Sequence, residues 1–193
     1  MPNPRRTILV AAVLFEGGLL LAAWVGGRLT GHPPFSGAVV TLPAIAWGVA
    51  ATLPPLLALG GLTRCRWPPF RRLLESVDAA VTPLFVRCTL VQLAVIAAVA
   101  GLGEEALFRG LIQGGAVEWL GDAGGLLAAS VLFGLAHLVT PVYAILAGIM
   151  GLYLGVLQLW SGNLVVPIVA HAVYDLGALL YLVRGRLRAS REP

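Results

Sequence analysis

Long apolar runs alternate with short polar interruptions along the chain. The first run covers residues 7–29 and the second covers residues 37–62. Both are long enough to cross a bilayer, because a transmembrane helix needs about 20 predominantly apolar residues. The pattern therefore predicts two N-terminal membrane spans, and Pro43, Pro54 and Pro55 are expected to kink the second.

The main polar interruption covers residues 63–78. Its arginines are followed by Glu75 and Asp78, and Trp67 and Phe70 lie between them. Arginine marks cytoplasmic loops, whereas aromatic residues of this kind favour the membrane interface. We expect a cytoplasmic loop that ends in a short amphipathic helix lying on the membrane surface.

The remaining sequence is almost continuously apolar to residue 183. Turn signals rich in Gly, Pro, Ser and Asn divide it, and the segments between them are 82–119, 124–139, 142–160 and 163–183. If 82–119 is one long helix the chain has six spans, whereas a break near Gly101 and Gly103 would give seven. Arginine clusters at both termini and in the loop should share the cytoplasmic side, which requires an even number.

These patterns predict an all-α, polytopic transmembrane helix bundle of about six spans, with seven or eight as alternatives and both termini cytoplasmic. Composition agrees, because only 11% of the residues are charged, whereas a soluble domain carries about 25%. All basic residues are Arg, as expected of a GC-rich genome, so we expect the cytoplasmic membrane of a bacterium. The arginines form no basic stripe with interleaved aromatics, so membrane lipids rather than nucleic acid are the expected surroundings.

Six ionisable residues interrupt the apolar runs in the second half of the chain. Placing Asp or Arg at the centre of a membrane helix costs about 2.5–3.5 kcal/mol each, so a purely structural bundle would not carry so many. We interpret them as a cluster that lines a cavity and carries the function. They are Glu104, Glu105, Arg109, His137, His171 and Asp175.

Helical spacing divides this cluster. Glu105 and Arg109 are four residues apart and can pair directly, whereas Glu104 is rotated by about 100° and is freer to act as a general base. His171 and Asp175 are also four residues apart and share a helix face.

Two further ionisable residues are interpreted as lying outside the functional cluster. Glu16 is expected to be a packing or interfacial residue, and His32 an inert residue of an extracytoplasmic loop. Cys65 and Cys88 have neither metal-site nor CxxC spacing and are interpreted as ordinary thiols.

The cluster falls into three ordered motifs on successive apolar segments. Residues 104–109 fit EExxxR, residues 133–137 fit FxxxH, and residues 171–175 fit HxxxN/D. In this order they resemble the CPBP family of CAAX-protease and bacteriocin-processing intramembrane proteases, whose best-known branch is the Rce1 type of prenyl-protein endopeptidase. The resemblance covers about residues 85–180.

The resemblance implies peptide-bond hydrolysis inside the bilayer. By this analogy Glu104 activates the attacking water with help from His137, while His171 and Asp175 polarise the scissile carbonyl or stabilise the oxyanion. Glu105 and Arg109 would support the site. An ionised Asp175 cannot donate a hydrogen bond as Asn would, so we expect it to orient His171 instead.

The apolar pattern and the resemblance together divide the chain into three regions. Residues 1–80 form two spans, the loop and the interfacial helix, residues 81–183 form a CPBP-like catalytic core, and residues 184–193 form a basic cytoplasmic tail. We favour a mechanism without a cofactor, because the sequence has no HExxH motif. Zinc held by Glu104, His137 and His171 stays open as an alternative.

Two rival functions stay open beside the intramembrane endopeptidase. The same fold could serve as a non-catalytic membrane scaffold or bacteriocin-immunity protein, or the acidic and histidine side chains could form the relay of a proton-coupled transporter. The expected substrate is a membrane-associated peptide, either a lipidated CAAX-type protein or a leader peptide. Neither the choice between these nor the oligomeric state follows from the sequence.

Overall fold

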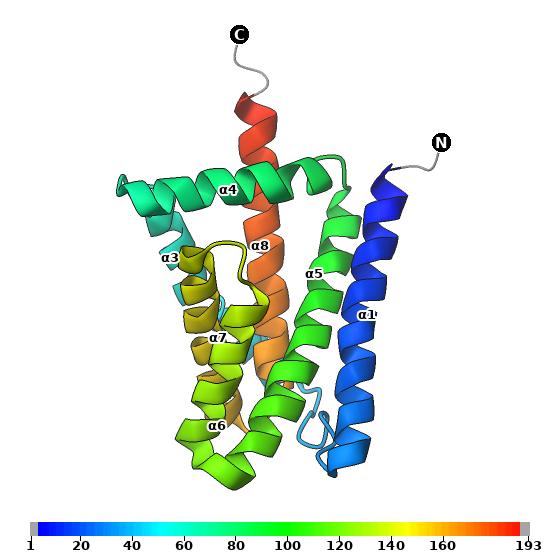
Figure 1. The fold of residues 1–193 in the computed structure, drawn as a ribbon. Helices are drawn as coiled ribbons and strands as arrows, with labels where there is room; N and C mark the ends of the chain where they lie inside the picture. Colours follow the sequence, from blue (N-terminus) through cyan, green and yellow to red (C-terminus); the bar gives the residue numbers. More distant parts are fainter. Residues whose placement is uncertain (1–3, 190–193) are drawn as a thin grey trace.

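The computed structural model describes residues 4–189, which form helices and contain no strand. The elements are α1 (Pro4–Thr30), α2 (Leu42–Ala50), α3 (Leu53–Leu62), α4 (Pro68–Phe85), α5 (Leu90–Glu105), the π-helix η1 (Ala106–Gln113), α6 (Gly114–Ala136), α7 (Pro141–Ser161) and α8 (Val165–Ala189). Figure 1 shows most of them running side by side, with α4 lying across one end. The predicted all-α bundle is confirmed.

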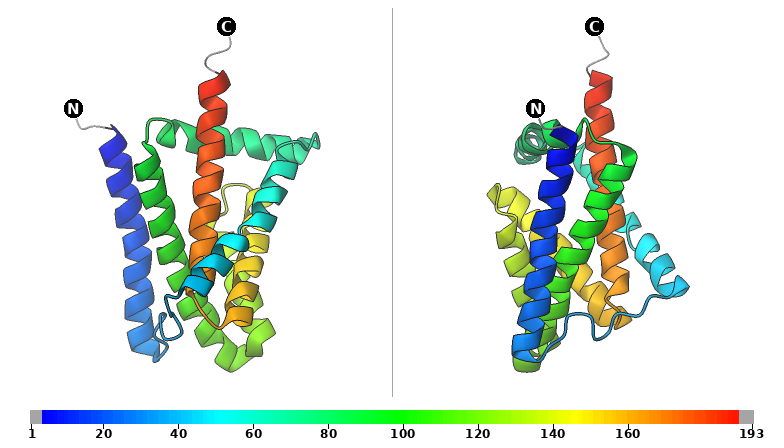
Figure 2. Two further views of the ribbon diagram at one scale, coloured as in Figure 1. Left: turned by 180° about the vertical axis from the view of Figure 1, so that it is seen from behind. Right: turned by 90° about the vertical axis from the view of Figure 1, so that its right-hand side faces the viewer.

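Five helical stretches in the described residues are long and apolar enough to cross a membrane. One of them, Leu90–Ala136, reverses direction at Gly121, whose φ of 70° and ψ of 173° are not helical. The reversal divides this stretch into two antiparallel parts and so gives six segments. α1 begins and α8 ends at the same end of the bundle, as Figures 1 and 2 show, which agrees with the predicted even number.

The segment after Gly121 is short. Residues 122–136 are helical and extend only about 22 Å at 1.5 Å per residue, less than the roughly 30 Å of a bilayer core. The turn that follows α6 therefore lies below the level of α4 in Figure 1. This shortness positions His137, which ends α6, at depth rather than at the surface.

The second predicted span is divided into α2 and α3. The break falls at Ala51 and Thr52, directly before Pro54 in the first turn of α3, where its missing N–H is tolerated. Pro43 does not kink the span as expected, because it stands in the first turn of α2, after the cap that Thr41 provides.

α4 is longer than the expected interfacial helix and extends to Phe85. The next helix begins at Leu90, where Thr89 and Gln92 cap it reciprocally. The membrane segment therefore starts eight residues later than the sequence pattern predicts. Arg71 and Glu75 are exposed on one face of α4, whereas Leu73 is only 4% exposed and faces the bundle.

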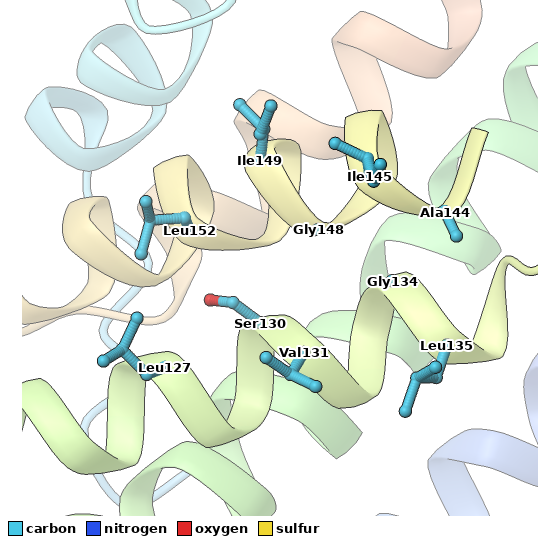
Figure 3. Close-up of a pocket in the computed structure, with 10 residues that line it drawn as sticks. All are labelled: Leu127, Ser130, Val131, Gly134, Leu135, Ala144, Ile145, Gly148, Ile149 and Leu152. Carbon is cyan, nitrogen blue, oxygen red and sulfur yellow. The ribbon is translucent and has the colours of Figure 1, made fainter. Parts of the chain in front are cut away.

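Close packing of α6 on α7 depends on small residues. A Cβ atom on Gly134 would lie 2.7 Å from the carbonyl oxygen of Ala144 and 3.2 Å from the backbone of Gly148, so only glycine permits this approach. A shallow apolar groove of about 350 Å³ follows the same pair of helices (Figure 3). Its walls include Val131 and Ile149, which are exposed apolar residues typical of a lipid-facing surface.

Candidate active site

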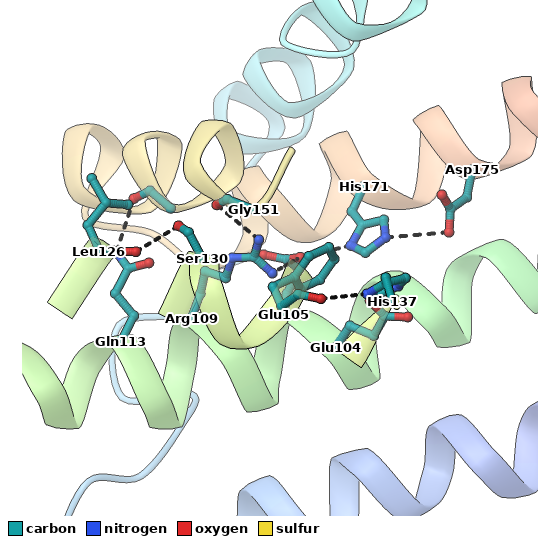
Figure 4. Close-up of polar contacts among 12 residues, drawn as sticks. Glu104, Glu105, Arg109, Gln113, Leu126, Ser130, His137, Gly151, His171 and Asp175 are labelled. Atoms are coloured by element: carbon teal, nitrogen blue, oxygen red, sulfur yellow. Dashed lines mark hydrogen bonds and ion pairs between the residues drawn. The ribbon is translucent and has the colours of Figure 1, made fainter. Parts of the chain in front are cut away.

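The structure brings all six predicted residues together, as Figure 4 shows. The first three come from the end of α5 and from η1, His137 ends α6, and the last two lie on α8. Glu105, Arg109 and His171 are at most 5% exposed. So many buried ionisable groups are tolerated in an apolar bundle only if they neutralise one another.

Arg109 forms an ion pair with Glu105, with Nη1 donating to Oε1 at 2.8 Å. Nη2 of the same guanidinium donates to the carbonyl oxygen of Gly151 at 3.0 Å, and the guanidinium carbon lies 4.4 Å from the centre of the Phe133 ring. The pair lies where the helix becomes π-helical, a local widening that is frequent at functional sites. Arg109 thereby connects η1 to α7 and to α6.

His171 contacts a carboxylate through each of its ring nitrogens. Nδ1 lies 2.8 Å from Oε1 of Glu105, and Nε2 lies 3.4 Å from Oδ2 of Asp175. A carboxylate oxygen only accepts hydrogen bonds, so this geometry favours a proton on both nitrogens. Asp175 accordingly stands where it orients His171.

Glu104 and His137 form the second half of the cluster. The Nδ1 atom of His137 lies 2.8 Å from the carbonyl oxygen of Phe133, so this nitrogen donates, and Nε2 is the acceptor in the neutral ring. Nε2 lies 3.6 Å from Oε2 of Glu104, which is buried and has no hydrogen-bond partner among the described residues. The two acceptors face each other at a separation that a bound water molecule can bridge.

A cavity of about 360 Å³ opens beside this pair. Its polar end is lined by Glu104, His137, His171 and Asp175, and the remainder is mostly apolar, with side chains that include those from α3, α4 and α8. α4 covers the cavity with the face that carries Leu73. The arrangement resembles a pocket with an acid–base pair at one end and room for an apolar group at the other.

The same cavity contains residues that the sequence reasoning missed. Glu16 on α1, interpreted from the sequence as a packing or interfacial residue, lines it, and so do Tyr143 and Tyr174. The signal for Glu16 was the one used for the other six residues, a charge inside an apolar run. Glu16 lies 88 positions before Glu104 in the sequence, and the packing of α1 on α5 brings it to the cavity. His32, by contrast, is not among the residues that line the cavity and pairs with Glu118 at 2.8 Å.

The donor set does not fit zinc in this arrangement. The described residues contain no group of three His, Cys, Asp or Glu side chains placed to hold a metal ion. His171 would have to present a nitrogen lone pair toward Glu104 and His137, but both of its nitrogens face other carboxylates. Zinc ligation by His requires the neutral ring with a free nitrogen.

A membrane-embedded helix bundle with a buried Glu–Arg–His network beside a cavity defines a polytopic membrane protein with an intramembrane acid–base site. Residues 86–177 match the family described as type II CAAX prenyl endopeptidase Rce1-like, so this segment belongs to that family and the predicted resemblance is confirmed. At the level of the family, the activity is that of a CAAX-type intramembrane endopeptidase. The matched segment contains all six clustered residues and excludes α1 to α4.

Comparison with curated proteins and with solved structures gives no match.

Proposed function

We propose that the chain hydrolyses a peptide bond of a membrane-associated substrate with water that Glu104 and His137 activate. The observation that carries this proposal is the buried Oε2 atom of Glu104, which has no hydrogen-bond partner among the described residues and faces Nε2 of His137 at 3.6 Å beside the cavity. A buried unpaired carboxylate oxygen is unfavourable unless something binds it. Water bound there would be held by two acceptors and would direct its own oxygen toward a peptide in the cavity.

The reaction follows from these positions. Glu104 takes a proton from the water as its oxygen bonds to the scissile carbonyl carbon, and the carbonyl oxygen becomes the oxyanion of a tetrahedral intermediate. The carbon–nitrogen bond then breaks, and the proton on Glu104 passes to the leaving nitrogen. The products are a carboxylic acid and an amine, and Glu104 returns to its ionised form.

Glu105, Arg109, His171 and Asp175 support this chemistry as a fixed frame. Their mutual contacts at 2.8 to 3.4 Å bring α8 against α5 and η1, so Glu104 and His137 need not reorganise during the reaction. Preorganisation of this kind is a large part of the catalytic effect in water-poor sites. No step in this scheme passes through a metal ion.

The cavity favours a substrate with an apolar group next to the scissile bond. Its apolar walls include Leu59 on α3, Leu74 on α4 and Leu182 on α8. A lipidated CAAX-type peptide or a hydrophobic leader peptide would place its apolar part there and its peptide bond near Glu104. Of these two we propose the lipidated peptide as the first substrate to test, because the family match points to it.

The test uses the purified full chain in liposomes and a fluorogenic farnesylated peptide with a C-terminal CAAX sequence. Cleavage by the wild-type protein should fall by roughly two to four orders of magnitude in Glu104→Ala and Glu104→Gln, the usual contribution of a general base. Glu118→Ala is the matched control, since Glu118 is exposed and lies outside the cluster. If the Glu104 variants cleave the peptide at the wild-type rate, Glu104 is not the general base.

A wild-type protein that does not cleave this peptide or a hydrophobic leader peptide would favour the scaffold function. Proton-coupled uptake that depends on Glu104 without peptide cleavage would favour the transporter. Expression and thermal stability of each variant in detergent must match the wild type for these comparisons to hold.

A further inference from the structure

Glu16 lies in the same cavity although α1 is outside the segment that matches the family. Its position depends on Gly103, which precedes Glu104. A Cβ atom on Gly103 would lie 2.6 Å from the carbonyl oxygen of Glu16 and 3.4 Å from its Oε2 atom. The absence of a side chain at Gly103 therefore allows α1 to bring the Glu16 carboxyl group directly beside the start of the first motif.

The carboxyl group of Glu16 has an unsatisfied atom in this position. Its Oε2 is buried and has no hydrogen-bond partner among the described residues. Glu104, His171 and Asp175 line the same cavity. A structural carboxyl group would be expected to have a partner, so Oε2 of Glu16 is available to something that enters the cavity.

Counting charges indicates the form in which Glu16 is held. In the described cluster Arg109 and His171 neutralise Glu105 and Asp175, and His137 faces Glu104. Because His137 is neutral, Glu16 and Glu104 are the two carboxyl groups lining the cavity that have no cationic partner in the part of the chain that the structure describes. Two ionised carboxylates in one cavity are strongly unfavourable, whereas one ionised and one neutral are tolerated. The proposed hydrolysis needs Glu104 ionised, so Glu16 is the neutral one.

The charged frame directs its hydrogen bonds inward. Both nitrogens of His171 face carboxylates, the Arg109 guanidinium donates to Glu105 and to the Gly151 carbonyl, and an ionised Asp175 only accepts. A neutral carboxylic acid at Glu16 supplies an O–H to the cavity, beside the hydroxyl groups of Tyr143 and Tyr174. Keeping a carboxyl group neutral in an apolar site so that it can donate to an oxyanion is a known catalytic device.

We propose that Glu16 is a catalytic residue held as the neutral acid, and that its O–H donates a hydrogen bond to the carbonyl oxygen that becomes the oxyanion. The proposal rests on the hydrolysis proposed above. Glu16 keeps its proton throughout, so no bond other than hydrogen bonds forms or breaks at this residue. α1 thereby completes an active site whose other residues come from the family-matched segment.

Two substitutions at Glu16 separate donation from charge. Glu16→Gln retains an N–H donor of similar shape, so kcat for the farnesylated CAAX peptide should stay within about 10-fold of the wild type. Glu16→Leu removes the donor, so kcat should fall by about 100-fold or more, the usual effect of losing one oxyanion donor, with little change in KM. Glu118→Gln and Glu118→Leu are the matched controls at an exposed position.

Three kinetic results would overturn the proposal. An equal loss in both Glu16 variants would assign a proton-transfer or charge role instead, and unchanged kcat in both would remove Glu16 from the reaction. Tyr143 also presents a hydroxyl group to the cavity. A loss in Tyr143→Phe together with unchanged kcat in Glu16→Leu would assign the donor to Tyr143.

Infrared spectroscopy tests the neutral acid without any substrate. A protonated carboxyl group has a C=O stretching band that shifts in heavy water, and this band should be present in the wild type at neutral pH. It should persist in Glu104→Gln and disappear in Glu16→Gln. A band that survives in Glu16→Gln, or no band in the wild type, would overturn the neutral form. If the wild type does not cleave peptide while the band behaves as expected, the proposed hydrolysis is refuted. The neutral form of Glu16 is then still supported, so the two failures can be told apart.

Discussion

Oε1 of Glu105 lies 2.8 Å from Nη1 of Arg109 and 2.8 Å from Nδ1 of His171. One carboxylate oxygen therefore joins η1 to α8, two elements that are separated by more than 50 residues of sequence. Glu105 is completely buried, and Arg109 is 2% exposed. The contact is the central link of the frame that holds the site together.

Replacing Glu105 should destabilise the fold strongly. Glu105→Ala leaves Arg109 with only the Gly151 carbonyl and removes the Nδ1 partner of His171. Breaking a buried pair in this way costs about 3–5 kcal/mol. Thermal unfolding in detergent should show a large fall in Tm, whereas Glu75→Ala on the exposed face of α4 should leave it nearly unchanged. Similar Tm values for the two variants would contradict the central role of Glu105.

Adding a side chain to Gly103 should separate α1 from α5. The Cβ atom of Gly103→Ala would lie 2.6 Å from the backbone oxygen of Glu16, so a backbone must move at a cost of about 1–3 kcal/mol. Gly18→Ala on α1 is the matched control, because its Cβ atom meets nothing within 4 Å. We expect a lower Tm and reduced cleavage only in Gly103→Ala, and equal behaviour of the two variants would show that α1 is not held by this contact.

Removing the imidazole of His137 should reduce kcat without unfolding the protein. His137→Ala deletes the acceptor that faces Glu104 at 3.6 Å, and losing an assisting base costs roughly 100- to 10,000-fold. His32→Ala is the control, since His32 pairs with Glu118 outside the cluster. Cleavage assays of both purified variants test this, and an unimpaired His137→Ala would remove His137 from the mechanism.

Chelators should leave cleavage unchanged. The two nitrogens of His171 both face carboxylates, so the donor set around Glu104 and His137 is incomplete for zinc. The measurements are total metal content of the purified protein and cleavage after treatment with a strong chelator. Stoichiometric zinc whose removal abolishes cleavage and whose return restores it would reverse this prediction and show that His171 rearranges.

Local patterns predicted much of the helical framework. The turn at Gly121, the cap at Thr140 and the left-handed Gly162 all fall at turn signals in the sequence, because glycine, proline and capping residues act through the backbone of their immediate neighbours. The length of α4 was not predicted. Residues 82–85 are apolar enough to belong to either the surface helix or the next span, and the cap at Thr89 decides between them.

The sequence by itself determined that this chain is a membrane helix bundle and that six ionisable residues interrupt the apolar runs of its second half, because both follow from the cost of placing polar groups in a bilayer. Spacing on one helix also predicted which side chains could pair, as with Glu105 and Arg109. Only the tertiary structure decided how the helices meet. It directs His171 toward Glu105 and brings Glu16 into the cavity. Contacts between distant helices depend on side-chain packing and on close approaches such as that at Gly103, which no local pattern encodes.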